Sequence, residues 1–162
     1  MLDDCLAPDL RLVVCGTAVG TASALKRAYY AGRGNKFWKT LYAVGLTPRQ
    51  LRPEEYRLLI QYGIGLTDVV KGQAGMDREI NFRGAMPGSI TEKILIAQPR
   101  AICFNGKKAA ELYLGQKSPD YGLQPERIGD TLIFVATSTS GAASGYWNIE
   151  TWQDVADALN QP

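Results

Sequence analysis

The segment RLVVCGTAVG, residues 11–20, decides the fold class. Its first half is apolar and β-branched and ends at Gly16, which is typical of a buried strand that delivers the chain to a loop. Residues 35–44 then carry apolar side chains at helical spacing, and Gly45 ends that pattern. The chain therefore opens with a strand, a loop and a helix.

The same alternation continues to the end of the chain. Apolar runs predict further strands at residues 65–70, 101–104 and 131–136, and helical patterns predict helices at 53–63, 87–97, 107–114 and 148–159. Residues 71–86 lack periodicity and are expected to form a long loop. The pattern predicts an α/β fold, a three-layer sandwich with a central, mostly parallel four-stranded sheet flanked by helices. No repeat or linker divides residues 1–162, so we expect a single domain.

Composition excludes several kinds of chemistry. With 46% hydrophobic and 21% charged residues, the 162-residue chain has the composition of a globular protein. It contains no histidine, which excludes Ser-His-Asp and Cys-His pairs and His-ligated metals. Three scattered cysteines are too few for a four-thiolate metal site and favour a reducing cytoplasm. The acidic N-terminus and the lack of a long apolar run predict a protein that is neither exported nor membrane-spanning.

Basic residues are concentrated between positions 26 and 39. The net charge is only +2, but this stretch has five basic residues and no acid, interleaved with aromatic side chains. The basic members are Lys26, Arg27, Arg33, Lys36 and Lys39. Such a stretch suits phosphate contacts beside a stacking platform. A solvated helix face with its apolar stripe turned inward explains the pattern equally well.

Four loops are expected at one edge of the sheet. Ligands of parallel sheets bind beyond the carboxyl ends of the strands, where the loops at residues 16–35, 68–85, 105–107 and 137–144 should converge. The first of these loops lacks the third glycine of a dinucleotide fingerprint and the Gly-Lys-Ser/Thr ending of a P-loop. The sequence therefore predicts a binding mouth that has neither of those nucleotide motifs.

Several short blocks of the chain resemble the uracil-DNA glycosylase superfamily, and within it the mismatch-specific uracil/thymine-DNA glycosylase branch. The blocks run in family order over most of the chain. They are Leu6-Ala7-Pro8, Cys15-Gly16 with Gly20, Gly34-Asn35-Lys36-Phe37-Trp38, Tyr62-Gly63-Ile64-Gly65-Leu66-Thr67, Gln98-Pro99-Arg100-Ala101, Phe104-Asn105-Gly106-Lys107, Gly122-Leu123-Gln124-Pro125 and Ser140-Gly141. The resemblance implies hydrolytic release of uracil from DNA without a metal or another cofactor.

The chemistry of this family accounts for such residues. The enzyme flips a nucleotide out of the duplex, stacks its base on an aromatic ring and reads the polar edge of the base with hydrogen bonds. Cleavage passes through a sugar cation and a departing uracil anion. Backbone amides stabilise the anion, and a polar side chain usually orients the attacking water.

The resemblance assigns base-binding roles to five residues. Tyr30 is expected to stack on the base, with Gly16 and Thr17 in the first motif beside it. Asn35 bonds the base or locks the loop, and Ser23 lies where side-chain size decides whether a thymine methyl fits. From the residues alone, the alternatives are a core tyrosine for Tyr30, a cap of the following helix for Asn35 and a cap of a short helical turn for Ser23.

A second group of residues is expected to contact DNA. It combines basic residues with the second motif, namely Arg33, Lys36, Ser138, Thr139, Ser140, Gly141, Ala142 and Ala143.

Two motifs depart from the family pattern. Ala18 and Val19 occupy the positions at which the branch usually has Asn and Pro, so the usual water-orienting side chain is missing. In the second motif Ser138-Thr139-Ser140-Gly141 replaces a His or Asn followed by Pro-Ser, and the small residues that follow provide no bulky wedge.

Asp68 is our candidate for the missing catalytic group. It ends a predicted strand at the binding mouth, where a carboxylate could orient water and stabilise positive charge on the sugar, although it would also repel the departing anion. The structural alternative is an aspartate that caps the next loop or pairs with Lys71 or Arg78.

The sequence thus favours a monomeric, cytoplasmic uracil-DNA glycosylase that acts on uracil-containing DNA with no cofactor. The main alternative is a non-catalytic binder of uracil-containing or abasic DNA. A nucleoside hydrolase or phosphate-loop enzyme is disfavoured by the basic aromatic stretch.

Overall fold

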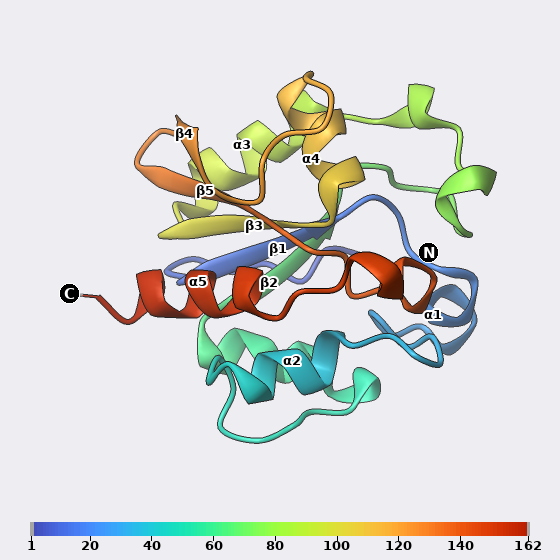
Figure 1. The fold of residues 1–162 in the computed structure, drawn as a ribbon, viewed down its shortest axis with the longest axis horizontal. Coiled ribbons are helices and arrows are strands. Elements are labelled where there is room, and N and C mark those ends of the chain that lie inside the picture. Colours follow the sequence, from blue (N-terminus) through green and yellow to red (C-terminus); the bar gives the residue numbers. More distant parts are fainter. Residues whose placement is uncertain (1, 162) are drawn as a thin grey trace.

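The sheet of the protein, in a computed structural model that describes residues 2–161, has the strand order β2-β1-β3-β5-β4 (Figure 1). The strands are β1 (Leu12–Gly16), β2 (Ile64–Asp68), β3 (Ala101–Asn105), β4 (Gly122–Ile128) and β5 (Thr131–Ala136). All neighbouring pairs are parallel except β4 with β5. The predicted α/β fold with a mostly parallel sheet is confirmed, but the sheet of the described residues has five strands rather than four.

The additional strand is β4, at the edge of the sheet. It contains Pro125, and its pairing with β5 shifts in register between Leu123 and Arg127. Proline has no N–H to donate to a ladder and is tolerated mainly on edge strands and at bulges. For that reason the segment does not show an uninterrupted strand pattern in the sequence.

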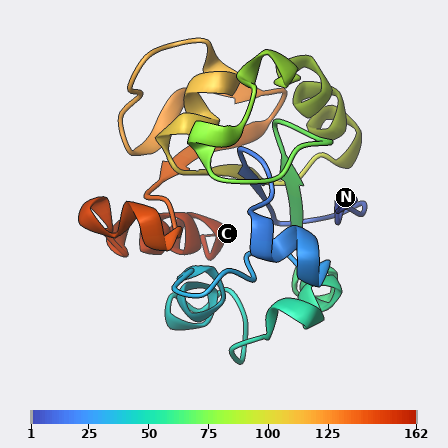
Figure 2. The same ribbon diagram turned by 90° about the vertical axis from the view of Figure 1, so that its right-hand side faces the viewer.

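Helices cover both faces of the sheet and form the expected three layers (Figures 1 and 2). One face packs against α2 (Phe37–Ala43), the 3-10 helix η1 (Pro53–Tyr62) and α5 (Glu150–Leu159). The other packs against α3 (Pro87–Ala97) and α4 (Lys107–Leu114). Neighbouring residues of β1 face opposite cores, because successive side chains of a strand alternate.

Short helices account for the remaining differences from the sequence prediction. Residues 53–62 form a 3-10 helix rather than an α-helix. The sequence pattern does not distinguish the two, because periods of 3.0 and 3.6 residues differ little over so few turns. The loop predicted at 16–35 contains α1 (Thr21–Lys26), which has no side-chain cap to mark its start. The long loop at 71–86 contains η2 (Asp77–Glu79) and η3 (Phe82–Gly84), and η4 (Gly141–Tyr146) follows β5. None of the helices within residues 2–161 is long and apolar enough to cross a lipid bilayer.

The carboxyl ends of the parallel strands meet at the edge that faces the viewer in Figure 2. β1 ends at Gly16, β2 at Asp68 and β3 at Asn105. From β1 the chain winds first to β2 on one side and then to β3 on the other, so the order reverses between β1 and β3. Such a reversal opens a crevice in which α/β proteins commonly bind ligands.

Candidate active site

Gly16 lies at the centre of a polar cluster on this edge. It pairs directly with Asp68 in the β1–β2 ladder. A Cβ atom on Gly16 would lie 2.8 Å from Asp68 Oδ1 and 3.2 Å from Tyr30 Oη. The first distance is shorter than a real side chain tolerates, so glycine is what allows the two oxygens to approach the same point.

Asp68 is the buried acid of the cluster, with only 4% of its surface exposed. Burial raises the pKa of Asp68 to about 6, although the nearby Lys71 ammonium acts to lower it. Asp68 Oδ2 lies 3.4 Å from Lys71 Nζ. The pairing with Lys71 considered from the sequence is therefore present, but it engages Oδ2 and leaves Oδ1 beside Gly16.

Tyr30 reaches the cluster from a left-handed backbone conformation, with φ of 53°. Its ring stacks on Phe37 with centroids 4.1 Å apart. Its Oη is buried and makes no hydrogen bond of standard geometry with any described residue. Burial and the charge of Asp68 raise the pKa of the Tyr30 hydroxyl, while Asn105 lies near enough to act in the opposite direction.

Ser23 supports the turn that carries Tyr30. Its buried hydroxyl accepts a hydrogen bond of 2.9 Å from the backbone N–H of Ala31. This contact ties α1 to the residue that follows Tyr30. The structure thus shows a local supporting contact for Ser23, and its role in excluding a thymine methyl stays a prediction.

Asn105 lies at the end of β3 on this edge. The sequence predicts it in a loop at the binding mouth but gives it no role. Its Nδ2 donates to Thr139 Oγ1, and its Oδ1 accepts from the Thr139 N–H, both at 3.0 Å. Both side chains are buried. The signal that could have identified Asn105 is a polar residue at the end of the apolar run 101–104, directly before Gly106.

The first-motif loop is fixed by the 71–86 segment. Thr17 Oγ1 donates to Asp77 Oδ1 at 2.9 Å, and Gly75 N–H donates to the Val19 carbonyl at 3.0 Å. Val19 is buried, and Ala18 presents only a methyl group. No polar side chain therefore comes from the two positions at which relatives have Asn and Pro.

Asn35 begins the segment that links Tyr30 to the second motif. Its Oδ1 accepts from Phe37 N–H at 3.0 Å, which is the local capping considered from the sequence. The next residue, Lys36, donates its N–H to the Thr139 carbonyl at 2.8 Å, and its Nζ donates to Ser144 Oγ at 2.8 Å. The predicted DNA-contacting segments around Lys36 and residues 138–143 are thus joined.

The second-motif loop is shaped mainly by its own hydroxyls. Ser138 Oγ accepts from Ser140 N–H, and Ser140 Oγ accepts from Ala142 N–H. Gly141 packs against the backbone of Gly34, and Ala143 is partly buried in η4. Thr139 is buried and its hydroxyl bonds Asn105; the expected contact of this residue with DNA stays a prediction.

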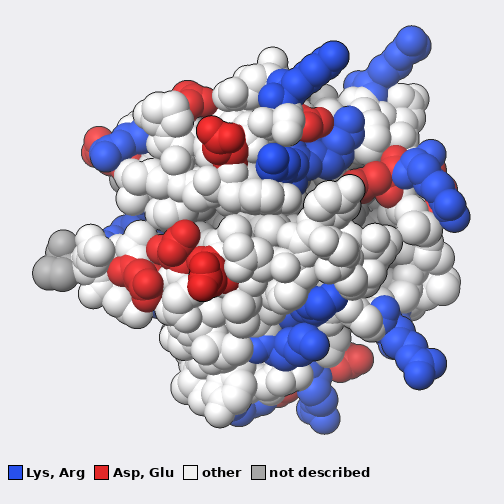
Figure 3. Space-filling model, viewed as in Figure 1, with Lys and Arg blue, Asp and Glu red and all other residues white. Residues whose placement is uncertain are grey.

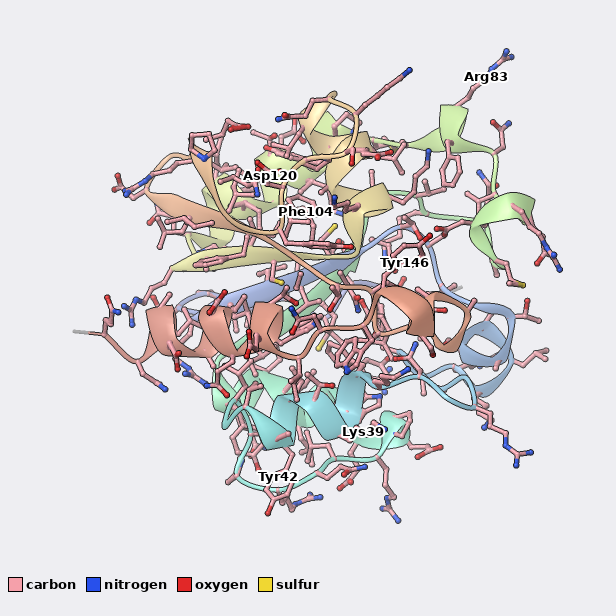
Figure 4. The ribbon with its side chains drawn as sticks, viewed as in Figure 1. Lys39, Tyr42, Arg83, Phe104, Asp120 and Tyr146 are labelled. Atoms are coloured by element: carbon pink, nitrogen blue, oxygen red, sulfur yellow. The ribbon has the colours of Figure 1, made fainter. Side chains whose placement is uncertain are left out.

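Charged side chains are unevenly distributed on the face seen in Figure 3. Acidic side chains lie along α5, whereas basic ones lie around α2 and, in the upper part of the view, on the side of the sheet covered by α3 and α4. Arg33 and Lys39 are exposed. Figure 4 shows Lys39 on α2, on the opposite side of the sheet from Arg83. The predicted basic stretch is therefore a surface feature close to the polar cluster.

A cavity of about 300 Å³ lies beside Tyr30. Asn35, Trp38, Lys39 and Arg52 contribute to its lining, but Gly16, Thr17 and Asp68 do not. Of the predicted base-binding residues, Asn35 lines this cavity, Gly16 lies in the polar cluster and Tyr30 is common to both, whereas Ser23 belongs to neither. Within residues 2–161 no three metal-ligating side chains come together.

Known proteins resemble the chain in both sequence and fold. The family model of the Uracil DNA glycosylase superfamily matches residues 4–157. The solution NMR structure of a "putative Uracil DNA glycosylase" from Methanosarcina acetivorans has a similar fold, with a TM-score of 0.69 at 24% sequence identity over 99% of this chain and 97% of that chain. The chain belongs to the uracil DNA glycosylase superfamily.

Proposed function

We propose that the protein is a monofunctional DNA glycosylase that hydrolyses the N-glycosidic bond of uracil and leaves an abasic site. Its family supports a glycosylase role, and uracil as the substrate is our inference. The observation that carries the proposal is the buried Asp68 carboxylate beside Gly16. It supplies an acceptor at the edge where Ala18 has replaced the usual amide.

Asp68 has two roles in this mechanism. Above a pH of about 6 its carboxylate is ionised, so Oδ1 can accept a hydrogen bond from water and direct a lone pair of that water to the sugar carbon. The same negative charge stabilises the sugar cation that forms as the base departs.

The base would be held by neutral groups. The Tyr30 ring provides a stacking surface, with Asn35 beside it in the cavity. Tyr30 Oη lies near Asp68 and is the polar group that could read the edge of the base. Backbone amides near Thr17 stabilise the departing anion, and Ser23 disfavours thymine in this proposal.

DNA would bind along the basic rim. Arg33 and Lys36 neutralise phosphates, while residues 138–143 follow the backbone of the strand. We infer a monomeric enzyme whose single domain comprises residues 1–162 and which acts in the cytoplasm without a cofactor.

Oligonucleotide cleavage tests this function. Single-stranded uracil DNA and U·A, U·G and T·G duplexes would be incubated with the protein in EDTA, and abasic products would be cleaved with alkali. We expect the uracil strands to be cut and EDTA to have no effect. Loss of uracil release in EDTA, restored by a divalent ion, would rule out the mechanism.

The second candidate is a non-catalytic reader of uracil-containing or abasic DNA. The specific observation in its favour is the pair Ala18 and Val19, which lack the polar group that the family uses. Tight binding to uracil or abasic DNA with no cleavage under single-turnover conditions would favour this alternative.

A further inference from the structure

A row of four charged side chains runs from Asp68 to α3. Asp68 Oδ2 lies 3.4 Å from Lys71 Nζ, Lys71 Nζ lies 2.7 Å from Asp4 Oδ1, and Asp4 Oδ2 lies 2.6 Å from Lys93 Nζ. Thr67, the neighbour of Asp68, donates its hydroxyl to Asp4 Oδ1 at 2.7 Å. The N-terminal segment is thereby linked to the end of β2, where backbone bonds between Cys5 and Leu66 also hold it.

Lys71 is fixed from three sides. Its ammonium has three N–H groups, and three acceptors surround it: Asp4 Oδ1, Asp68 Oδ2 and Tyr29 Oη. Tyr29 donates its own hydroxyl proton to the Asp3 carbonyl at 2.9 Å, so towards Lys71 it acts as an acceptor. Each proton of the ammonium therefore has a separate partner.

This arrangement distinguishes the two oxygens of Asp68. Oδ2 is the oxygen bound to Lys71, and Oδ1 is the oxygen that faces Gly16 and the site. We infer that Lys71, held in place by Asp4, is a positioning residue that turns Asp68 Oδ1 towards the substrate and offsets part of its negative charge. The offset reduces the repulsion that a bare carboxylate would exert on a departing anion. The catalytic consequence rests on the proposed function, whereas the positioning does not.

The inference predicts that replacing Lys71 and replacing Asp4 shift the pKa of Asp68 in opposite directions. The ionisable groups that face Asp68 come from five segments, and they are Asp4, Cys15, Tyr29, Tyr30, Lys71 and Lys93. Burial raises the pKa of the thiol and of both hydroxyls, so these three stay neutral near pH 7. The charges that act on Asp68 are therefore two lysines, which lower its pKa, and Asp4, which raises it.

The test is a titration of the Asp68 carboxyl carbon by NMR in the full chain. Lys71→Met should raise the midpoint by about one unit or more, because the cation is lost. Asp4→Asn should lower the midpoint, because it removes a negative charge and leaves Lys71 with Asp68 as its only carboxylate. Arg78→Met, which removes an exposed cation from the same loop, should leave the midpoint unchanged.

The sign of the shift decides the outcome. A midpoint that does not move, or that moves the same way in both variants, overturns the inference. If Lys71→Met does not fold, Asp4→Asn decides alone: a lower midpoint supports the inference, and an equal or higher midpoint contradicts it.

A second measurement separates this inference from the proposed function. In single-turnover cleavage of uracil DNA, the acid limb of the pH profile should follow the NMR midpoint of each variant, with DNA affinity unchanged. If the midpoints shift as expected but no variant and no parent protein cleaves DNA, the positioning stands and the glycosylase proposal fails.

Discussion

The two halves of the carboxyl edge are built differently. At the ends of β3 and β5, Asn105 and Thr139 exchange two hydrogen bonds and satisfy each other. At the ends of β1 and β2, Asp68 carries a buried charge, and Tyr30 Oη lacks a partner of standard geometry among the described residues. A satisfied neutral pair is stable at any pH, whereas a buried carboxylate and an unpaired hydroxyl both reduce stability.

This difference bears on the proposed role of Asp68. Proteins usually pair their buried polar groups, and exceptions gather at functional sites. The neutral half, which contains Asn105 and Thr139, holds two loops together. The charged half, which contains Asp68 and Tyr30, keeps Asp68 Oδ1 and Tyr30 Oη directed at one point. The comparison is therefore consistent with the proposed function, in which Asn105 and Thr139 support the site and Asp68 takes part in the reaction.

The largest expected effect comes from Asp68→Asn. This change keeps the shape of the side chain but removes its charge, so single-turnover cleavage should fall by about 10²- to 10⁴-fold. Binding to uracil DNA should stay nearly intact. Cleavage at the parent rate would show that the charged half is not the reacting half and would leave leaving-group stabilisation by backbone amides as the source of catalysis.

Ala18→Asn sharpens the same comparison. It returns an amide to the position that relatives use for the attacking water. In the Asp68→Asn background it should recover part of the lost rate. Recovery would mean that the two groups serve one function, one from the loop after β1 and the other from the end of β2. No recovery from a folded double variant would contradict that equivalence.

Much of the fold and part of this edge follow from the sequence. Residues 131–136 and 87–97 occur as predicted, because their hydrophobic periodicity is strong. Asp68 lies at the carboxyl end of β2, at the expected mouth, although β2 covers Ile64–Asp68 and the predicted strand extended to residue 70. The family resemblance adds Tyr30, whose Oη does reach the cluster.

Other features depend on contacts between distant segments. The contact of Asp4 with Thr67 spans 63 positions, and that of Asn105 with Thr139 spans 34. Neither pair forms a local pattern, so neither could be found by periodicity or spacing. The edge strand β4 is missed for a different reason, because Pro125 and a register shift remove its regular alternation.

The next effect is the pH dependence of stability. Asp68 titrates near pH 6 in the folded protein and near pH 4 in an unfolded chain, so between these values the folded state holds more protons. The free energy of unfolding should therefore fall as the pH rises through this window, by up to about 3 kcal/mol. Urea denaturation at about pH 5 and about pH 8 should show about half of this decrease, since an unfolded Asp68 is already mostly ionised at pH 5.

Two variants tell the halves apart in that experiment. Asp68→Asn should abolish this part of the difference between the two pH values. Asn105→Ala leaves Thr139 unpaired and should lose about 1–3 kcal/mol at both pH values, without changing the difference. A pH-dependent loss in Asn105→Ala would mean that the two halves are coupled.

Tyr30 should give a smaller, selective effect. Tyr30→Ala removes the stacking surface, worth about 1–3 kcal/mol per base, and should reduce turnover more than binding to undamaged DNA. Tyr30→Phe loses no hydrogen bond in the free protein, so its thermal stability should not fall. Equal losses of turnover and of undamaged-DNA binding in Tyr30→Ala would point to a core tyrosine instead.

The smallest expected effect concerns the basic rim rather than the cluster. If Arg33 contacts a phosphate, Arg33→Gln should reduce the slope of log affinity against log salt by about 0.9 on duplex DNA. Lys36→Gln should reduce the slope by a similar amount and also lower affinity at any salt, because Lys36 Nζ bonds Ser144 and lies 5.6 Å from the Trp147 ring centre. Arg83→Gln is the matched control, since Arg83 is exposed on the opposite side of the sheet (Figure 4) and should leave the slope unchanged. Equal slopes in all three variants and the parent would identify residues 26–39 as a solvated helix face with no phosphate contact.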